Sequence, residues 1–440
     1  MTDCIKYIID FLLGDTLSAD HSNTYIGYTD CSEEFHKYKL VIIPSGFFDE
    51  NCYGKPHSMP ELPLKTIEDI PLLFGVPEII RQDNRIILKA DIIASAYFLL
   101  SRYEEFACRQ IRDAHGRFPG KESLPYRAGF IHRPVVDEYG RLLRKLLREV
   151  KINLPEPDKK INKIYLTVDI DVPFLFRGMK GLLRGLLSSK YRNTALKTFF
   201  GHITNDPAYT FPSIIEQNKK LKESDASSVE NIYFFKSQGK SPQDKPVYNL
   251  FSKDIQQIFS LCEKENITVG LHASYYSGIH PEVIIKEKEN LEKASSRTIT
   301  CNRHHFLSCR EPEDFCRLSE AGITDDFTMG YADVSGFRLG TCRPVSYINP
   351  VDRKVYPLTL HSLTVMECTL DRKEYMNFQY DEALLYCKNL IDKIAEFNGE
   401  VTLLWHNTSF IESPDNWQPK LYQALTDILY EKTNHCFRNQ

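Results

Sequence analysis

Short apolar runs alternate with amphipathic helical patterns through the C-terminal two-thirds of the chain. Runs of strand length lie at 164–169, 231–235, 267–271, 298–301, 362–367 and 401–405. Apolar residues at helical spacing predict helices over 252–265, 281–294, 312–321 and 380–398. This alternation is typical of an α/β fold, built either as a (β/α) barrel or as a doubly wound sheet. In both architectures the reactive side chains lie at the carboxyl ends of the strands.

The N-terminal part also mixes strands and helices, over a shorter length. The pattern predicts strands over 39–45 and 85–89 and helices over 91–106 and 134–150. Asp91 is a suitable N-cap for the first helix, and Pro134 suits the first turn of the second. We expect a smaller α/β domain here, and its polar residues show no grouping that suggests chemistry.

A polar segment with two prolines, residues 151–163, separates the two parts. A chain of 440 residues is also long for one ordinary hydrophobic core. We therefore predict an N-terminal accessory domain of unknown role over 1–155 and a second, larger domain over 160–440.

Composition narrows the class of protein. Hydrophobic residues make up 42% of the chain and charged residues 26%, the balance of a soluble globular protein. The formal net charge of −4 gives no indication of a nucleic-acid partner. No stretch reaches the length of about 18 apolar residues that a transmembrane helix needs, so none is expected.

The N-terminus and the cysteines favour a cytoplasmic location. The first apolar run is interrupted by Lys6 and Asp10 and lacks the features of a signal peptide. The twelve cysteines form no C-x-x-C pair, so we interpret them as reduced thiols. The loose group Cys301, Cys309 and Cys316 fits no standard zinc spacing.

Asp169-Ile170-Asp171 is the first candidate for chemistry, because an apolar strand runs straight into it. Alternation along a strand places the two carboxylates on the same side, where one could bind a metal and the other accept a proton. The same spacing occurs in haloacid-dehalogenase-type phosphatases, in nucleotide-sugar glycosyltransferases and in structural turns. The first of these gives no role to later histidines. The second expects a nucleotide-binding layer upstream, and the sequence shows no convincing one.

Two further strands end in a histidine. His272 follows Val269-Gly270-Leu271, and a neutral imidazole there is a good ligand for a divalent metal. His406 follows Leu403-Leu404-Trp405 and could act as a general acid toward a leaving amine. A lone histidine in such a position is more often structural, so the indication comes from both together.

Two loop segments add candidates. His304 and His305 are adjacent, so on an extended backbone they point to opposite faces and at most one can face a common site. The glycine-rich run from Gly322 to Gly340 contains Arg338, which could orient a carboxylate or a substrate oxygen. A surface loop and a structural arginine are the plain alternatives.

The order of these motifs resembles the NodB-type polysaccharide deacetylases of carbohydrate esterase family four, over residues 160–440. The chain is also similar to a divergent bacterial branch that carries an extra N-terminal domain. The shared segments are Leu271–Tyr275, Arg303–Leu307, Asp326–Asp333 and Gly336–Thr341. The resemblance implies a distorted (β/α) barrel that uses a divalent metal, expected to be zinc, to remove acetyl groups from N-acetylated sugars.

The resemblance also implies a ligand set. Asp171 and His272 match two of the family's metal ligands, but the second histidine of that motif is replaced by Tyr276. His305 is expected to be the third ligand instead, with His304 and then His280 as the alternatives.

Catalytic roles follow from the same comparison of motifs. Asp169 would be the general base, Arg338 would orient it, and His406 would be the general acid. Asn407 departs from the family, which usually has aspartate at that position. The residues expected to bind substrate are Arg303, Asp326, Tyr275 and Trp405.

Alternatives to this function remain open. The departures at Tyr276 and Asn407 also fit an inactive carbohydrate-binding or scaffold protein, and the barrel could act on a non-sugar amide. The expected partner is a glycan or amino-sugar substrate, which could be lipid-linked. Residues 174–192 are basic and apolar together, as in a lid helix on the barrel rim or an interfacial helix that makes peripheral membrane contact.

Overall fold

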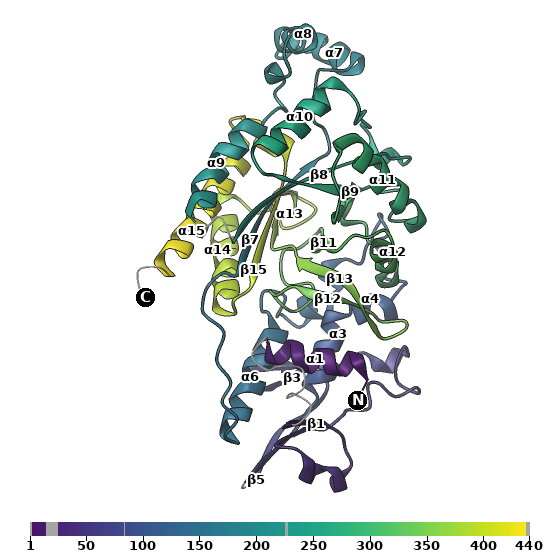
Figure 1. The fold of residues 1–440 in the computed structure, drawn as a ribbon, viewed down its shortest axis with the longest axis vertical. Coiled ribbons are helices and arrows are strands. Elements are labelled where there is room, and N and C mark those ends of the chain that lie inside the picture. Colours follow the sequence, from purple (N-terminus) through teal and green to yellow (C-terminus); the bar gives the residue numbers. More distant parts are fainter. Residues whose placement is uncertain (1, 15–24, 83, 225–227, 437–440) are drawn as a thin grey trace.

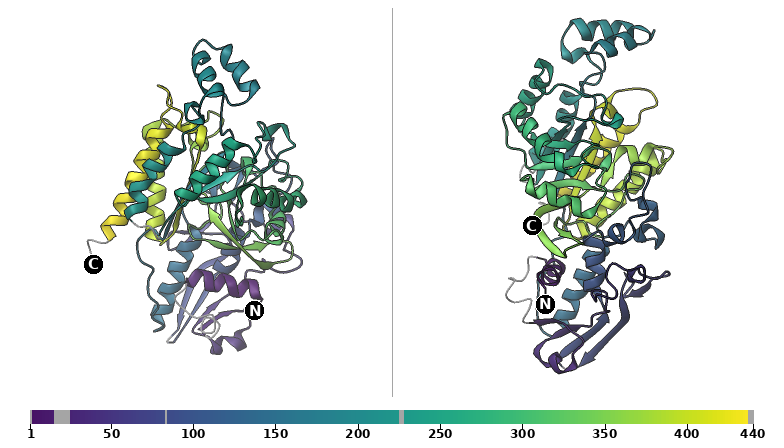
Figure 2. Two further views of the ribbon diagram at one scale, coloured as in Figure 1. Left: turned by 45° about the horizontal axis from the view of Figure 1, so that its top comes forward. Right: turned by 90° about the vertical axis from the view of Figure 1, so that its right-hand side faces the viewer.

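The computed structural model describes residues 2–14, 25–82, 84–224 and 228–436 (Figure 1). The N-terminal region lies at one end of an elongated molecule, and a pair of short helices projects from the other end (Figures 1 and 2). Between them lies a large curled sheet with helices packed around it. No helix in the described ranges combines the length and the apolar character needed to cross a membrane.

The N-terminal region contains a four-stranded sheet in the order β1-β2-β6-β5 and a separate β3–β4 pair. Its strands are β1 (Ile26–Tyr28), β2 (Leu40–Ile42), β3 (Lys65–Ile67), β4 (Ile70–Leu72), β5 (Gly75–Gln82) and β6 (Arg85–Ala90). Its helices are α1 (Asp3–Leu13), α3 (Ile92–Leu100), α4 (Tyr103–Ala107), α5 (Leu124–Arg127) and α6 (Val135–Glu149). The N-terminal region therefore contains both strands and helices, as the sequence pattern predicted.

The predicted helix over 91–106 is two helices. Asp91 caps α3 by accepting a hydrogen bond from the Ala94 amide. The chain then breaks at Arg102, whose φ of 57° lies in the left-handed region and so cannot continue a right-handed helix. The predicted helix over 134–150 corresponds to α6 and is confirmed.

The C-terminal region is built on a nine-stranded sheet in the order β12-β13-β11-β10-β9-β8-β7-β15-β14. Neighbouring strands are parallel except for the β12–β13 pair. The strands are β7 (Lys163–Ile170), β8 (Val229–Phe235), β9 (Thr268–Ala273), β10 (Cys301–His304), β11 (Asp325–Met329), β12 (Val345–Asn349), β13 (Lys354–Ser362), β14 (Val365–Met366) and β15 (Glu400–His406).

Helices connect the parallel strands and cover the sheet (Figure 1). They are α7 (Met179–Leu186), α8 (Arg192–Phe200), α9 (Phe211–Ser224), α10 (Lys253–Lys264), α11 (Ile284–Ser295), α12 (Phe315–Glu320), α13 (Glu367–Asp371), α14 (Tyr380–Glu396) and α15 (Gln418–Cys436). The predicted α/β class is confirmed as a curled, half-barrel sheet. Within the described residues, backbone pairing does not join the end strands β12 and β14.

Some of the predicted strand boundaries were wrong. The strand expected over 298–301 is β10, which begins at Cys301 and carries the Arg303-His304 pair on the strand itself. The sequence pattern also missed β11, β12 and β13. A charged turn joins the antiparallel β12 and β13, and β13 contains Pro357, which weakens a strand pattern.

Buried ion pairs join the two regions. Glu105 of α4 accepts hydrogen bonds from Arg102 and from Arg338 of the glycine-rich run, and all three side chains are buried. Burial opposes ionisation of Glu105, but the two guanidinium groups lower its pKa to about 2. Asp137 of α6 accepts from the Thr341 hydroxyl and from Arg343. The N-terminal region is thus fixed against the sheet by charge as well as by a continuous apolar core.

His361 bridges strands that are distant in the sheet order. Its Nδ1 lies 2.8 Å from Glu400 of β15 and its Nε2 lies 3.0 Å from Asp325 of β11. Burial disfavours the imidazolium, but the hydrogen bonds to Asp325 and Glu400 outweigh it and raise the pKa of His361 to about 9. The charged imidazole therefore ties β13 across the curl of the sheet to β15.

We expect His361→Gln to lower the free energy of unfolding by about 3 kcal/mol near pH 6, because it leaves the buried Glu400 carboxylate and the half-buried Asp325 carboxylate without a counter-charge. Since folding raises the pKa of His361, its contribution is complete below its unfolded pKa of about 6.5 and is lost as pH rises through about 9. Urea unfolding of both proteins from pH 6 to pH 10 should show the difference shrinking with pH. A difference that is constant over this range would contradict the charged bridge.

Candidate metal centre

Parallel register brings the candidate side chains to one edge of the sheet. His406 of β15 lies opposite Asp169 of β7, and Arg303 of β10 lies opposite His272 of β9. Asp171 follows β7 directly. These five side chains come from the ends of four strands that are far apart in the sequence. They meet because the strands end at the same edge of the sheet.

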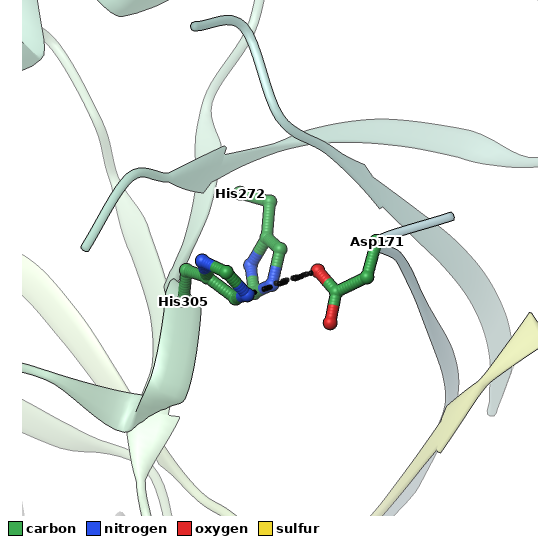
Figure 3. Close-up of side chains that lie close together, drawn as sticks. All are labelled: Asp171, His272 and His305. Atoms are coloured by element: carbon green, nitrogen blue, oxygen red, sulfur yellow. Dashed lines mark ion pairs between the residues drawn. The ribbon is translucent and has the colours of Figure 1, made fainter. Parts of the chain in front are cut away.

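Asp171, His272 and His305 point toward one another (Figure 3). Asp171 Oδ1 lies 3.4 Å from His272 Nε2 and 3.3 Å from His305 Nε2. Two ligands of a tetrahedral zinc ion, each about 2.1 Å from the metal, are separated by roughly 3.4 Å. The spacing of these three atoms is therefore that of ligands around one small cation.

The hydrogen bonds around the cluster leave the atoms that face its centre free to bind a metal. His272 Nδ1 lies 2.9 Å from the Arg303 carbonyl, which can only accept, so Nδ1 carries the proton. His305 Nδ1 lies 3.1 Å from Asp244 Oδ1, a carboxylate–histidine arrangement common behind metal ligands. Within the described residues, Asp171 Oδ1 and His272 Nε2 are buried without a hydrogen-bond partner. Two nitrogens and one carboxylate oxygen fit a divalent ion such as zinc.

The charges of the cluster are strongly coupled. Burial disfavours the Asp171 carboxylate, but His305 and His272 hold its pKa well below its usual range. Burial likewise opposes the charged form of His305, while Asp171 and Asp244 raise its pKa. Lys236 Nζ lies 3.8 Å from Asp171 Oδ1 and donates to the carbonyls of Asp244 and Pro246.

Asp169 is held by Arg303. Arg303 Nη1 donates to Asp169 Oδ1 at 2.9 Å and to the Thr167 hydroxyl at 2.7 Å, and the guanidinium also lies over the ring of Phe234. Arg303 is fully buried, so it is placed to orient the carboxylate rather than to meet a substrate, which corrects its predicted role.

Arg338 is placed elsewhere, contrary to the expectation that it orients Asp169. Its guanidinium donates to Glu105 and to the Gly330 carbonyl, at the contact between the two regions. The sequence motifs assigned the orienting role to Arg338 alone. Arg303 is the one that reaches Asp169 because its strand pairs with β9, whereas the loop that carries Arg338 turns toward α4.

His406 faces the cluster from the other side. Its Nε2 lies 3.6 Å from Asp171 Oδ2, and its Nδ1 lies 2.6 Å from Glu367 Oε1. Glu367 also accepts from the His406 amide and from the Ser409 hydroxyl. Burial opposes the imidazolium, but Glu367 and Cys368 raise the pKa of His406 well above its usual range. Glu367, Cys368 and His406 also lie close enough to form a second ligand group.

Asp326 and Trp405, both expected to bind substrate, lie in the interior. Asp326 is fully buried and accepts from Asn302 and Thr328. Trp405 is fully buried against Tyr422, because strand alternation turns it away from the side that His406 occupies. Both residues support the sheet.

Tyr275 is buried beside the site. Its ring packs against Phe306 and beneath Arg310, and its amide donates to Asp244 Oδ1. It therefore helps to position the carboxylate behind His305.

The other histidine candidates lie outside the cluster. His304 points to the opposite face from His305 and contacts Asn302, and burial lowers its pKa to about 3. His280 stacks on Tyr276 near the surface, 3.4 Å from Glu282. Asn407 donates to the carbonyls of Val172 and Ala208.

A small pocket of about 70 Å³ opens beside the cluster. Asp169, Asp171, His305 and His406 line its floor, and Leu307, Met366 and Leu404 form an apolar wall. Arg117 of the N-terminal region reaches this pocket. It donates to the Phe306 carbonyl, at the point where Phe306 and Leu307 have φ values of 62° and 51°. Arg117 thus braces the strained turn that follows His305.

Four contributors were not expected from the sequence. Glu367 had a signal, because it ends a predicted strand, and Lys236 directly follows another. Asp244 lies in a short 3-10 turn (Pro242–Asp244) with no strand before it, and Arg117 lies in the region where no grouping of polar residues was found. Only the folded chain brings these last two to the site.

We expect His305→Ala and Asp171→Ala to lose bound divalent metal, because each removes one of three ligands. Asp244→Asn should weaken zinc binding by about 10–100-fold through loss of the carboxylate behind His305. Plasma mass spectrometry of purified protein and calorimetric zinc titration measure both effects. His280→Ala, which lies outside the cluster, is the matched control and should bind like the wild type. Full metal content in His305→Ala would refute this ligand set.

Parts of the chain are similar to known proteins. Residues 1–152 match a family of unknown function, DUF7033. No curated protein matches the chain in sequence. A crystal structure from Mycobacterium smegmatis assigned as a polysaccharide deacetylase is similar at 10% identity and a TM-score of 0.39, covering 62% of this chain and 86% of that one. PuuE allantoinase is similar at 12% identity and a TM-score of 0.37, covering 64% and 89%.

Proposed function

We propose that this chain is a metal-dependent hydrolase that removes an acetyl group from an N-acetylated sugar or glycan. The observation that carries the proposal is the convergence of Asp171, His272 and His305 on one point, with unpartnered ligand atoms, between Asp169 and His406. The motif order that resembles the NodB-type deacetylases supports the choice of an amide substrate. A divalent ion held by the three ligands would polarise the amide carbonyl and acidify a water molecule.

Asp169 is the proposed general base. It lines the pocket and accepts a hydrogen bond from the Arg303 guanidinium. Arg303 occupies Oδ1, so Oδ2, which lies 3.6 Å from His272 Nε2, is the oxygen that faces the cluster. A proton from the attacking water would pass to this carboxylate.

His406 is the proposed general acid. Glu367 holds its Nδ1 and stabilises the imidazolium, while Nε2 lies 3.6 Å from Asp171 Oδ2. A proton on Nε2 can be given to the nitrogen that leaves as the carbon–nitrogen bond breaks. The proposed base and the proposed acid both line the pocket in which the amide would lie.

The pocket suits a small acyl group. Its volume of about 70 Å³ is well below the roughly 300–1,000 Å³ of sites that enclose a whole drug-sized ligand. The acetyl methyl can contact Leu307, Met366 and Leu404, and the sugar would lie outside the pocket. Arg372 and Tyr375 also line the pocket and offer hydrogen-bond donors to sugar oxygens.

We expect Asp169→Asn to lower kcat for acetate release from N-acetylglucosamine oligomers by about 10²–10⁴-fold, because the amide cannot accept the proton. Metal content should remain that of the wild type, since Asp169 is not one of the three ligands. Asp381→Asn, at the exposed start of α14, is the control and should leave both values unchanged.

The same assay separates the alternatives. Wild-type protein that binds metal and N-acetylated sugars without releasing acetate would be an inactive carbohydrate-binding protein. Turnover of non-sugar amides alone would keep the mechanism and reject the sugar substrate.

A further inference from the structure

The helices α7 and α8 form a hairpin that projects from the body of the protein (Figures 1 and 2). The hairpin begins at Met179 and is joined to Asp171 by the segment 172–178, which contains no helix or strand. It therefore extends from the same end of β7 as the candidate metal centre.

The hairpin has a small apolar core of its own. Phe176, Leu182 and Ala195 are buried between its two helices and pack with Leu186, Tyr191 and Phe199. This internal packing explains how a short pair of helices is held away from the main sheet. Only some of the apolar residues of the hairpin take part in this internal packing.

The remaining apolar side chains of the hairpin are exposed. Met179, Leu183 and Leu187 are spaced four residues apart, so they share one side of α7, and their exposed fractions are 61%, 56% and 89%. Phe200, the last residue of α8, is 77% exposed. Such a row has no partner in the described part of the chain and is costly to leave in water.

The acidic and basic residues are unevenly distributed here, because every charged residue of the hairpin segment is basic. Residues 172–205 contain no aspartate or glutamate and six cations: Arg177, Lys180, Arg184, Lys190, Arg192 and Lys197. The whole chain has a formal charge of −4, so the rest carries −4 minus 6, or −10. Among the described residues, only Arg177 of the six forms an ion pair, with Asp254 of α10. The hairpin is a local cationic element on an acidic protein.

A neighbouring loop extends the apolar surface. Val247 and Phe251 are 54% and 57% exposed. Val247 lines a cavity of about 730 Å³ together with Met179, Lys180 and Arg184 of the hairpin. Apolar and basic side chains are therefore interleaved across both segments.

We propose that the α7–α8 hairpin is a docking surface for an anionic lipid bilayer. Lysine and arginine side chains near an anionic leaflet each contribute about 1 kcal/mol of attraction, and exposed apolar residues beside them can enter the headgroup region. Charge complementarity favours the anionic bilayer over a neutral one, and the row of exposed apolar side chains favours lipid over a purely polar polyanion. Because the hairpin follows Asp171 in the chain, docking would hold the candidate metal centre close to the membrane surface.

Vesicle sedimentation with the full-length protein tests this proposal. Vesicles of equal parts phosphatidylglycerol and phosphatidylcholine should bind the protein about tenfold or more tightly than phosphatidylcholine alone, and added salt should weaken the binding. The double variant Lys180→Glu/Arg184→Glu should lose about tenfold or more of that binding. Leu183→Ser/Leu187→Ser should also weaken it, because both side chains are exposed and can change without disturbing the hairpin core.

Leu385→Ser/Lys388→Glu on α14 is the matched control, since Leu385 is 62% exposed there, and it should bind like the wild type. Equal binding to both kinds of vesicle, or hairpin variants that bind like the control, would overturn the proposal. A dimer that dissociates in Leu183→Ser/Leu187→Ser, without vesicle binding by the wild type, would assign the surface to a second copy of the chain instead. None of these readouts depends on hydrolase activity, so the two proposals fail separately.

Discussion

The parallel register of β7, β9, β10 and β15 is the constraint on which the candidate site depends. It places His406 opposite Asp169 and Arg303 opposite His272 at one edge of the sheet. Arg303 then links the candidate ligand His272 to the proposed base Asp169. Its carbonyl fixes the tautomer of His272, and its guanidinium holds Asp169. A shift of β10 by one residue would turn Arg303 away and bring His304 inward, so ligand geometry and base orientation are set by the same pairing.

The N-terminal region supports this arrangement from outside the sheet. The buried group of Glu105, Arg102 and Arg338 fixes it against the glycine-rich run, and Arg117 braces the turn after His305. Pairs of this kind are strongly destabilising to break, because one charge is then left buried without a partner. The region that matches a family of unknown function thus contributes Arg117 to the lining of the pocket.

Sequence patterns were sufficient for β7, β8, β9 and β15 and for the polar side chains at their ends. Asp171, His272 and His406 follow apolar runs, so alternation and strand polarity already place them together. The motifs assigned the orienting role to Arg338, whereas Arg303 is the arginine that reaches Asp169, because this depends on which segment pairs with β9. Sequence patterns also could not find Asp244 or Arg117, which lie in loops brought to the site by tertiary packing. Trp405 was expected to bind substrate because it adjoins His406 in the sequence. Strand alternation instead turns its side chain into the core.

The proposed function depends above all on the binding of one divalent ion by Asp171, His272 and His305. A crystal of the full chain, grown with zinc and measured at the zinc absorption edge, would show the ion itself. One anomalous peak is expected about 2.1 Å from Asp171 Oδ1 and from the two Nε2 atoms, with a fourth position open to solvent. A peak bound instead by Glu367, Cys368 and His406, or no peak at saturating zinc, would contradict this binding.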